Sequence, residues 1–567
     1  MIRQSFSVNS QGVQVEKIWL KHYPAGVPAE IDPQQYASIP ELFAESVARY
    51  GDKPAWSNLG RTLSFSELDT LSRDFAAYLT QVAGLKRGDR VALMMPNLLQ
   101  YPVALFAVLR AGLIVVNVNP LYTSRELLHQ LNDSGATAIV ILENFADKLA
   151  EVIDRTQVTE VITTQVGDLA GFPKSLLVNL VVKHVKKMVP PFSLDKRTTF
   201  PAALKQGKSL ALAPVTLQPE DTAFLQYTGG TTGVSKGAEL THRNMIANLL
   251  QASVWARTRL NEGEEVFIAA LPLYHIFALT ANLLFGLELG AKNVLVTNPR
   301  DFPGFVKTLG EEKFSFMTGV NTLFNALMDT PGFSALDFSH FKITLGGGMA
   351  VQASVAARWK EITGVTLTEA YGLTETSPAV CINPLDLDDF NGMIGLPLPS
   401  TEVEVRDADG KTLPLGEQGE LWIRGPQVMK GYWNRPDETA EVMDAEGWLR
   451  TGDVALINDD GYVKIVDRLK DMIIVSGFNV FANEIEEVIA AHPKVKEVGV
   501  VGVPDERAGE AVKAFVVARD ASLTEQELKD YCHEQLTAYK CPRLITFLDE
   551  LPKTNVGKVL RRALRDM

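Results

Sequence analysis

The sequence predicts an α/β protein with two domains: a large N-terminal domain over residues 1–469, built of parallel αβ sheets plus a small β-rich lobe, and a small α+β C-terminal domain over residues 470–567. Three observations lead to this prediction. The 567 residues exceed what one hydrophobic core usually supports. Strand and helix patterns alternate through most of the chain, and the pattern changes twice, after residue 393 and after residue 471.

Strand and helix patterns alternate most clearly between residues 89 and 142. Apolar runs of strand length are followed by runs with helical spacing, and turn residues such as Asn119-Pro120 and Ser134-Gly135 separate them. This alternation is typical of βαβ units whose parallel strands are buried on both faces. The expected elements are the strand Val91–Met95, the helix Tyr101–Arg110, the strand Leu113–Val118, the helix Arg125–Asn132 and the strand Ala136–Leu142.

The middle third has further strand patterns at Ala291–Thr297 and Ser315–Val320. Just before them, Ile268–Leu287 is nearly uncharged and approaches the ~20 residues that cross a bilayer. Pro272, His275 and Asn282 interrupt it, and each would need a partner in hydrocarbon. We therefore interpret the segment as a buried strand-turn-helix, with a membrane span as the alternative.

The pattern changes after Met393 and again after Asp471. Alternating β-branched residues at 401–405 and 420–423 predict antiparallel hairpins with one solvated face, which form the β-rich lobe. The last part of the chain, about one hundred residues, is long enough for a separate α+β domain. Its expected elements are the helix Asn483–Ala491, the strands Glu497–Val503 and Ala511–Ala518, and the helix Thr524–Gln535.

Charge and cysteine content exclude several classes of protein. The chain has 55 basic and 68 acidic residues, a net charge of −13, so nucleic acid is not an expected partner. The N-terminus has no apolar stretch of signal-peptide length. Cys381, Cys532 and Cys541 are too few and too scattered for a disulfide framework or a two-pair zinc site. We expect a cytoplasmic protein, and the sequence leaves a homodimer open.

One segment, Gly171–Phe192, is basic inside this net-acidic chain. It carries no acidic residue and mixes leucines and valines with Lys174, Lys183, Lys186 and Lys187. A helix that lies peripherally on the inner membrane, at its cytoplasmic face, has this composition. A solvated helix with one face in the core would have it too, and both interpretations stay open.

The strongest local signal is the segment Tyr227–Gly237, with the sequence YTGGTTGVSKG. Its glycines let the backbone approach a ligand and turn N–H groups inward, while its hydroxyls and its lysine add donors and a positive charge. Such a loop suits phosphate groups. The candidate phosphate-binding residues are Tyr227, Thr228, Gly229, Gly230, Thr231, Thr232, Gly233, Ser235, Lys236 and Gly237.

Other assignments of these residues are weaker. A Walker A loop needs glycine immediately before the lysine, where Ser235 stands. Gly233–Gly237 matches the G-x-S-x-G elbow of α/β-hydrolases, but an elbow serine needs an apolar strand directly before it. A plain Gly/Thr hairpin is the structural alternative. Nothing near Cys532-His533 indicates an activated thiolate.

Five segments occur in the order seen in acyl-adenylate-forming enzymes, which the chain resembles over essentially its full length. They are Tyr227–Gly237, Tyr371–Thr376 (YGLTET), Thr451–Asp453 (TGD), Asp467–Asp471 (DRLKD) and Pro552–Lys558 (PKTNVGK). Gly447–Lys470 resembles the signature of fatty acyl-CoA synthetases, and the whole chain resembles bacterial long-chain fatty acid–CoA ligases. Arg450 and Ala482 depart from that pattern, because histidine and proline are common there.

This resemblance implies a two-step reaction. ATP and a long-chain fatty acid would form acyl-AMP and pyrophosphate with Mg²⁺, and the acyl group would then pass to coenzyme A with release of AMP. Because an anionic carboxylate attacks an anionic phosphate, catalysis requires neutralisation and alignment. By resemblance, Thr374 donates to the α-phosphate, Glu375 holds Mg²⁺, and Lys558 contacts the α-phosphate and the carboxylate.

The resemblance also implies where the nucleotide lies and how the second step occurs. Asp453 would accept the ribose hydroxyls, with Arg468 helping. The C-terminal domain would be mobile, turning about the hinge Lys470 to withdraw Lys558 and present the loop Ser476-Gly477-Phe478 for the coenzyme A step. The residues expected around adenine are Gly346, Gly347, Gly348, Tyr371 and Gly372.

The acyl-chain site is not set by local sequence, because its pocket is assembled from distant segments. Candidates that also suit a plain core are Tyr274, His275, Phe277, Val320 and Phe324. An aryl- or medium-chain acid ligase is the alternative substrate class. A membrane-surface lipid-binding protein that merely holds nucleotide is the alternative outside enzymes, and Lys558 and Glu375 disfavour it because binding alone needs neither.

Overall fold

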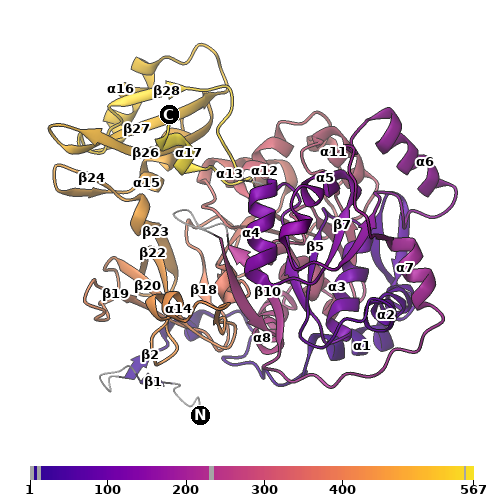
Figure 1. The fold of residues 1–567 in the computed structure, drawn as a ribbon. Helices are drawn as coiled ribbons and strands as arrows, with labels where there is room; N and C mark the ends of the chain where they lie inside the picture. Colours follow the sequence, from indigo (N-terminus) through magenta and orange to yellow (C-terminus); the bar gives the residue numbers. More distant parts are fainter. Residues whose placement is uncertain (1–5, 9–13, 229–234, 555–556) are drawn as a thin grey trace.

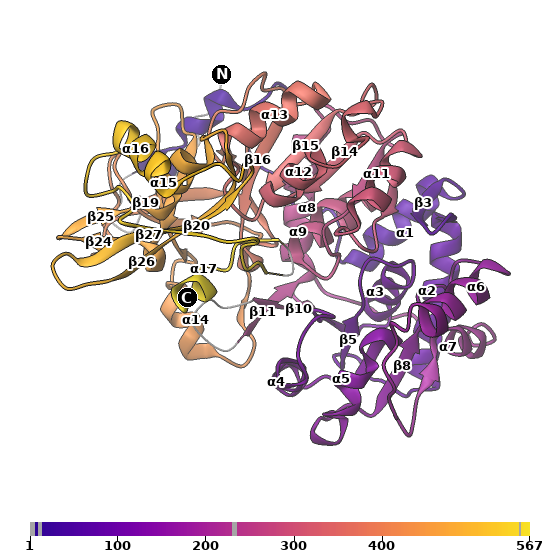
Figure 2. The ribbon, with the colours of Figure 1, turned by 90° about the horizontal axis from the view of Figure 1, so that it is seen from above.

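The computed structural model describes residues 6–8, 14–228, 235–554 and 557–567. Figure 1 shows a large body and a smaller unit, drawn in yellow, that contains the C-terminus. Figure 2 shows the same arrangement from above, with the small unit at the opposite end of the molecule from helices α6 (Lys174–Leu180) and α7 (Phe200–Gly207).

The first large sheet has eight strands in the order β21-β11-β10-β6-β5-β7-β8-β9. Its central strands pair in parallel and are buried, which confirms the alternation expected between residues 89 and 142. Helices α3 (Gln100–Arg110) and α4 (Ser124–Ser134) form two of the crossovers. The strands are β5 (Arg90–Met94), β6 (Ile114–Asn117), β7 (Ala138–Leu142), β8 (Glu160–Thr164), β9 (Thr198–Thr199), β10 (Thr222–Thr228), β11 (Lys236–Thr241) and β21 (Gly431–Tyr432).

The second large sheet has nine strands in the order β18-β17-β16-β15-β14-β12-β13-β3-β4. Strands β14, β15 and β16 are mutually parallel, so their carboxyl ends meet at one edge, where ligands of open α/β sheets bind. The strands are β3 (Pro54–Asn58), β4 (Arg61–Ser64), β12 (Val266–Ala269), β13 (Lys292–Leu295), β14 (Phe316–Gly319), β15 (Ile343–Gly347), β16 (Leu367–Gly372), β17 (Ala379–Ile382) and β18 (Leu396–Pro397).

Helices cover both sheets, and several begin at caps that the sequence encodes. Ser64, Thr123 and Thr241 each accept a hydrogen bond from the backbone N–H three residues later, in reciprocal capping boxes. The remaining helices of the large body are α1 (Ile39–Tyr50), α2 (Phe65–Gln81), α5 (Ala146–Ala150), α8 (His242–Ala256), α11 (Phe302–Gly310), α12 (Asn321–Met328), α13 (Ala353–Thr363) and α14 (Pro436–Val442).

The apolar segment Ile268–Leu287 is a buried strand-turn-helix, as predicted. Strand β12 leads into α9 (Ile276–Ala278), a π-helical turn and α10 (Phe285–Leu289). The amide of Asn282 is satisfied inside the core, where it donates to the Ile268 carbonyl at 3.2 Å and accepts from Thr318 at 2.8 Å. Among the described residues, no helix combines the length and the apolar character that a membrane crossing requires.

The predicted β-rich lobe is an antiparallel sheet in the order β19-β20-β22-β23. Its strands are β19 (Glu402–Arg406), β20 (Gly419–Arg424), β22 (Leu449–Ile457) and β23 (Val463–Arg468). The N-terminal strands β1 (Phe6–Val8) and β2 (Gln14–Glu16) form a separate antiparallel pair.

The C-terminal unit has its own sheet and its own core. A short 3₁₀ turn, Leu469–Asp471, leads from β23 into this sheet, at the point where the sequence predicts the division between domains 1–469 and 470–567. That division stays a prediction. The elements of the unit are β24 (Ile473–Val475), β25 (Phe478–Val480), α15 (Ala482–Ala490), β26 (Val495–Asp505), β27 (Gly509–Ala518), α16 (Glu525–Gln535), β28 (Leu544–Phe547) and α17 (Arg561–Arg565).

The basic segment Gly171–Phe192 lies outside the core. Helix α6 continues into a π-helical turn at Val181–Val185, and no residue of the segment is buried. Figure 1 shows α6 at the edge of the large body. Val178, Val181 and Val182 are half-buried on one side of the helix, so the packed-face interpretation and the membrane-surface interpretation both stay predictions. Six other apolar side chains of the segment face solvent. These are Phe172 (85% exposed), Leu176, Leu177, Leu180, Val185 and Met188.

Candidate active site

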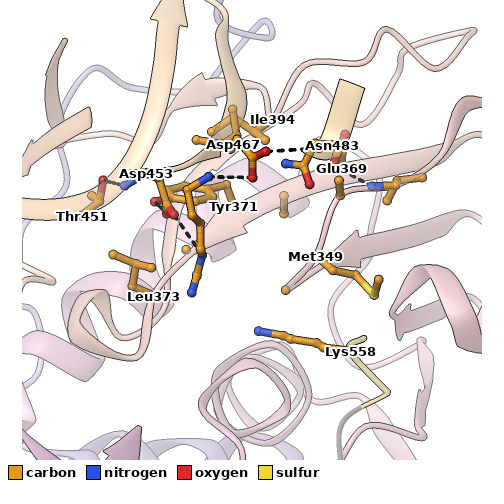
Figure 3. A pocket seen from close by; sticks show the side chains of 18 of the residues that line it. Met349, Glu369, Tyr371, Leu373, Ile394, Thr451, Asp453, Asp467, Asn483 and Lys558 are labelled. Carbon is orange, nitrogen blue, oxygen red and sulfur yellow. Dashed lines mark hydrogen bonds and ion pairs between the residues drawn. The ribbon is translucent and has the colours of Figure 1, made fainter. Parts of the chain in front are cut away.

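A cavity of about 1770 Å³ lies among the carboxyl ends of β15 and β16, the β-rich lobe and the C-terminal unit. Figure 3 shows side chains of both bodies around it. The sequence-predicted residues that line it are Tyr227, Thr228, Gly347, Gly348, Tyr371, Gly372, Thr374, Glu375, Asp453, Arg468, Lys470 and Lys558. The structure thus gathers residues of four of the five ordered segments, and the first two residues of the Tyr227–Gly237 segment, around one space.

The glycine-rich segment connects β10 to β11, which pair antiparallel with Thr228 opposite Lys236. Ser235 donates to the Thr228 carbonyl at 2.6 Å, and Lys236 forms an ion pair with Glu438. Neither side chain lines the cavity, and Gly237 packs against the Tyr227 ring. Gly229, Gly230, Thr231, Thr232 and Gly233 lie outside the described residues, so their phosphate contacts stay predictions.

Thr374 and Glu375 lie in a 3₁₀ turn directly after β16, at the carboxyl edge of the second sheet. Glu375 Oε1 accepts a 2.7 Å hydrogen bond from the Tyr432 hydroxyl, and the Glu375 carbonyl accepts from the backbone N–H of Met429. The carboxylate is thereby held at the cavity wall. Within the described part of the chain, no cluster of three or more His, Cys, Asp or Glu side chains offers a ready-made metal site.

Asp453 is a buried carboxylate, 2% exposed, at the cavity wall. Its Oδ2 accepts from the Tyr371 hydroxyl at 2.5 Å, and its Oδ1 lies 3.1 Å from Arg468 Nε (Figure 3). Burial and the Asp453 charge raise the pKa of Tyr371, so the phenol stays protonated and keeps donating. The Asp453 carboxylate is therefore fixed beside the Tyr371 ring and beside the glycines at the end of β15, Gly347 and Gly348, which we call the glycine edge.

The glycine edge comes from β15. Gly348 has a φ of +78°, and a Cβ there would lie 3.2 Å from Lys558 Cε, so glycine permits the close approach of these two segments. Gly347 also lines the cavity. Gly346 does not, because it lies inside β15, where a Cβ would meet Leu367 and Val351.

Lys558, a residue of the C-terminal unit, extends its side-chain amine into the cavity (Figure 3). Burial lowers the pKa of Lys558 to about 8, and repulsion from Arg468 adds to this while Asp453 opposes it. Burial, with the Lys558 charge, also lowers the pKa of His275 to about 3, so this imidazole is neutral beside the lysine. The cavity therefore brings together the Lys558 amine, the Asp453 carboxylate and the neutral His275 imidazole.

Comparisons with known proteins decide the family. Residues 43–433 match the AMP-binding enzyme family, and residues 484–558 match the AMP-binding enzyme C-terminal domain. The chain belongs to the AMP-binding enzyme family. It is 58% identical to a long-chain-fatty-acid–CoA ligase of Yersinia pestis and 57% identical to one of Escherichia coli O6:H1, covering 97% of this chain and 98% of each relative.

A solved structure supports the same assignment. The anthranilate CoA ligase AuaEII in complex with anthranoyl-AMP superimposes with a TM-score of 0.84 at 25% identity, over 94% of this chain and 98% of that one. The predicted α/β architecture with a small C-terminal unit is therefore confirmed.

The structure adds cavity residues that the sequence analysis of this AMP-binding enzyme missed. Glu369 lies two positions before Tyr371 on β16, so both side chains face the cavity. Burial raises the pKa of Glu369 to about 8, although Oε1 accepts from the Val351 N–H at 3.0 Å. Glu369 could have been predicted from the sequence, because side chains two positions apart on a strand face the same side and Tyr371 was already a candidate.

The apolar lining of the cavity was not recognisable from sequence. It comes from helices and strands far apart in the chain and includes Trp255, Phe285, Phe316, Ile382 and Leu385. Of the predicted acyl-site candidates, only His275 and Phe277 line the cavity. Tyr274, Val320 and Phe324 do not, and Phe324 packs on Trp359 in the core at 4.8 Å between ring centroids.

In this AMP-binding enzyme the three residues of the predicted coenzyme A loop do not line the cavity, although Asn479 and Tyr539 beside them do. Ser476 and Gly477 form the turn between β24 and β25, and Phe478 stacks on Tyr539 at 4.9 Å. Arg450, one of the two departures from the family pattern, lines the cavity and pairs with Glu420 at 3.0 Å. Ala482, the other, is buried at the start of α15.

The lowered pKa of Lys558 predicts a pH dependence. The lysine acts as a cation only below its pKa, so kcat/KM for pyrophosphate release should fall as pH rises through about 8. In Lys558→Arg the guanidinium keeps its charge, so the residual activity should lack this limb. The measurement is initial-rate kinetics from pH about 6.5 to about 9.5 at fixed ionic strength. The same descending limb in both proteins would assign it to another group.

Proposed function

We propose that this AMP-binding enzyme is a long-chain fatty acid–CoA ligase that forms acyl-AMP and pyrophosphate and then acyl-CoA and AMP. The observation that carries the proposal is the cavity itself, in which the Lys558 cation, the Asp453 carboxylate and an apolar lining share one space. The nearly full-length relatives named long-chain-fatty-acid–CoA ligase support the substrate class. An aryl- or medium-chain acid is the alternative.

In the first step, we assign Asp453 and Arg468 to the ribose and Tyr371 with the edge of β15 to adenine. The hydrogen bond and ion pair that fix Asp453 hold an acceptor ready for two hydroxyls. Thr374 and Lys558 would then meet the α-phosphate, where Lys558 neutralises charge as the fatty carboxylate attacks. In these roles the residues align the fatty carboxylate with the α-phosphate and compensate their negative charges. Alignment and charge compensation are the main requirements for a reaction between two anions.

Glu375 fits the role of a Mg²⁺ ligand. Its carboxylate reaches the cavity and is held by Tyr432, and Mg²⁺ in nucleotide sites is commonly bound by one or two carboxylates plus substrate phosphates. When bound, the ion supplies charge neutralisation at the phosphates. The glycine-rich loop would contribute its N–H groups to the β- and γ-phosphates.

The second step needs a different arrangement of the same parts. Lys558 occupies the cavity, whereas Ser476, Gly477 and Phe478 lie outside it. We therefore assign the observed arrangement to adenylate formation. Rotation about Lys470, in the 3₁₀ turn between the two bodies, would withdraw Lys558 and bring the outlying loop to the thioester step.

The test is pyrophosphate release from the full chain with ATP, Mg²⁺ and one carboxylic acid at a time. We expect palmitate to give a higher kcat/KM than octanoate or benzoate, because the apolar lining rewards each buried methylene. Preference for octanoate or benzoate would favour the alternative substrate class. Absence of release with every acid would reject the enzymatic proposal.

We also propose that the basic segment Gly171–Phe192 touches anionic membrane surfaces, from which an insoluble substrate is delivered. Its apolar side chains are exposed beside its lysines, which is the composition of an interfacial helix. The segment is tied to the large body by Asn179, which donates to Asp168 at 3.1 Å, and by Lys183, which lies 3.8 Å from Glu143. Apolar contact and lysine charge therefore act together at this one edge of the molecule.

Replacing Lys183, Lys186 and Lys187 with glutamine should weaken association with vesicles that contain anionic lipid. Each lysine near such a surface contributes ~1 kcal/mol, screened by salt. Co-sedimentation at low salt measures the effect. A matched control replaces three exposed lysines elsewhere, Lys86, Lys307 and Lys411, and so makes the same charge change. Equal loss in both variants, or no loss in the first, would reject the surface.

A further inference from the structure

Helix α12 presents a row of polar side chains to the C-terminal unit. Thr322, Asn325 and Asp329 are spaced three and four residues apart, so they lie along one side of the helix and its end. The Thr322 hydroxyl donates to the Gly557 carbonyl at 2.8 Å, and Asn325 Nδ2 donates to the Lys496 carbonyl at 3.0 Å. Every member of the row thus has a partner across the boundary, because Asp329 also pairs with an arginine of the C-terminal unit.

The contact of Thr322 lies immediately beside Lys558. Gly557 has a φ of +85°, and a Cβ there would lie 2.9 Å from Thr322 Oγ1 and 3.3 Å from Val320 Cγ2. Glycine is therefore needed for its carbonyl to reach the hydroxyl. Because that carbonyl belongs to the peptide that continues into Lys558, the hydrogen bond restrains the main chain from which the lysine side chain extends.

Asp329 forms one ion pair with each body, so the two ion pairs can be compared. Asp329 Oδ1 lies 2.9 Å from Arg519 Nη1 in the C-terminal unit and 2.7 Å from Arg358 Nη1 in α13 of the large body. The two arginine side chains are 37% and 35% exposed. The ion pair of Arg519 crosses from one body to the other, and that of Arg358 does not. Each arginine makes one further hydrogen bond, Arg519 to Asn325 Oδ1 at 3.4 Å and Arg358 to the Met328 carbonyl at 3.1 Å.

We propose that this row on α12 positions Lys558 for adenylate formation by seating the C-terminal unit, and that it takes no part in transfer to coenzyme A. The inference rests on the proposed function. All three contacts join residues on opposite sides of the 3₁₀ turn Leu469–Asp471. A rotation about this turn that brings Ser476–Phe478 to the cavity must break these three contacts. They therefore stabilise only the orientation in which Lys558 lines the cavity.

The first test is Thr322→Val, which removes the hydroxyl and keeps the shape of the side chain. Single-turnover formation of palmitoyl-AMP should slow by about 5- to 30-fold, because the Gly557 carbonyl loses its donor. Consumption of supplied palmitoyl-AMP with coenzyme A should stay within about twofold of wild type. Thr322→Ser should restore the first step. Thr330→Val removes a hydroxyl that bonds only within α12 and its end, to Ala326, and should leave both steps unchanged.

The second test compares Arg519→Ala with Arg358→Ala. Arg519→Ala should slow adenylate formation by about 2- to 5-fold, the range for a partly exposed ion pair, and Arg358→Ala should not slow it. Equal effects of both substitutions, or equal loss of both half-reactions in Thr322→Val, would overturn the proposal. Lys558→Ala is measured in parallel. If it impairs adenylation while Thr322→Val does not, only the α12 inference fails; if Lys558→Ala has no effect, the proposed chemistry fails as well.

Discussion

Lys558→Ala is expected to slow formation of palmitoyl-AMP by about 10²–10³-fold or more, the effect of removing one electrostatic donor from a transition state. ATP binding should be largely kept, because Asp453, Tyr371 and Arg468 contact one another without help from this lysine. A group that acts on charge developing in the transition state changes the rate more than the affinity. Pyrophosphate exchange and calorimetric ATP titration measure the two quantities.

Lys553→Ala is the matched control for Lys558→Ala. Lys553 lies in the same segment but pairs with Glu497 at 2.8 Å inside the C-terminal unit, and it does not line the cavity. Its substitution should leave pyrophosphate exchange near wild type. Wild-type exchange in Lys558→Ala would move the catalytic role to another group, and equal losses in both variants would indicate damage to the C-terminal unit.

Lys470→Pro should separate the two half-reactions. Lys470 lies in the 3₁₀ turn Leu469–Asp471. Residues in 3₁₀ turns have φ near the value that proline imposes, so we expect the observed orientation to persist while rotation is blocked. Palmitoyl-AMP should therefore still form from ATP and palmitate. Transfer to coenzyme A should fail, because the loop Ser476–Phe478 stays outside the cavity. Single-turnover kinetics, with coenzyme A added after the adenylate has formed, measures both steps.

Lys470→Ala distinguishes a restricted backbone from a lost side chain. Alanine removes the same amine but leaves φ and ψ free to change, so we expect it to retain transfer to coenzyme A. Loss of transfer in the alanine variant would assign the effect to the side chain. Preservation of both steps in Lys470→Pro would place the hinge at another residue, and comparable loss of both would indicate general damage.

Local pattern determined much of the fold. The alternation between residues 89 and 142 predicted β5, α3, β6, α4 and β7 to within a few residues, because period 2 and period 3.6 record which side chains face a core. Local sequence also identified candidate site residues that are adjacent in the chain. Thr374 and Glu375 reach the cavity because the turn that carries them directly follows β16.

Contacts between distant residues were decided by the tertiary structure. Asp453 meets Tyr371 across 82 positions of the chain, and Glu375 meets Tyr432 across 57. No periodicity within one element specifies such a pair, since it depends on how two sheets pack. The apolar lining was missed for the same reason, and the α12 row lies on a helix whose sequence does not show what its polar side faces.

The sequence by itself determined the alternation of strands and helices between residues 89 and 142 and the five ordered motifs, because each rests on neighbouring residues. The family resemblance that these motifs carry identified Lys558, Glu375 and Asp453 as candidates. The tertiary structure decided that six apolar side chains of Gly171–Phe192 face solvent, and that Lys558 rather than Ser476–Phe478 lines the cavity. Both outcomes depend on the orientation of one packed body or segment against another. That orientation is set by the sum of many long-range contacts, which composition and spacing do not record.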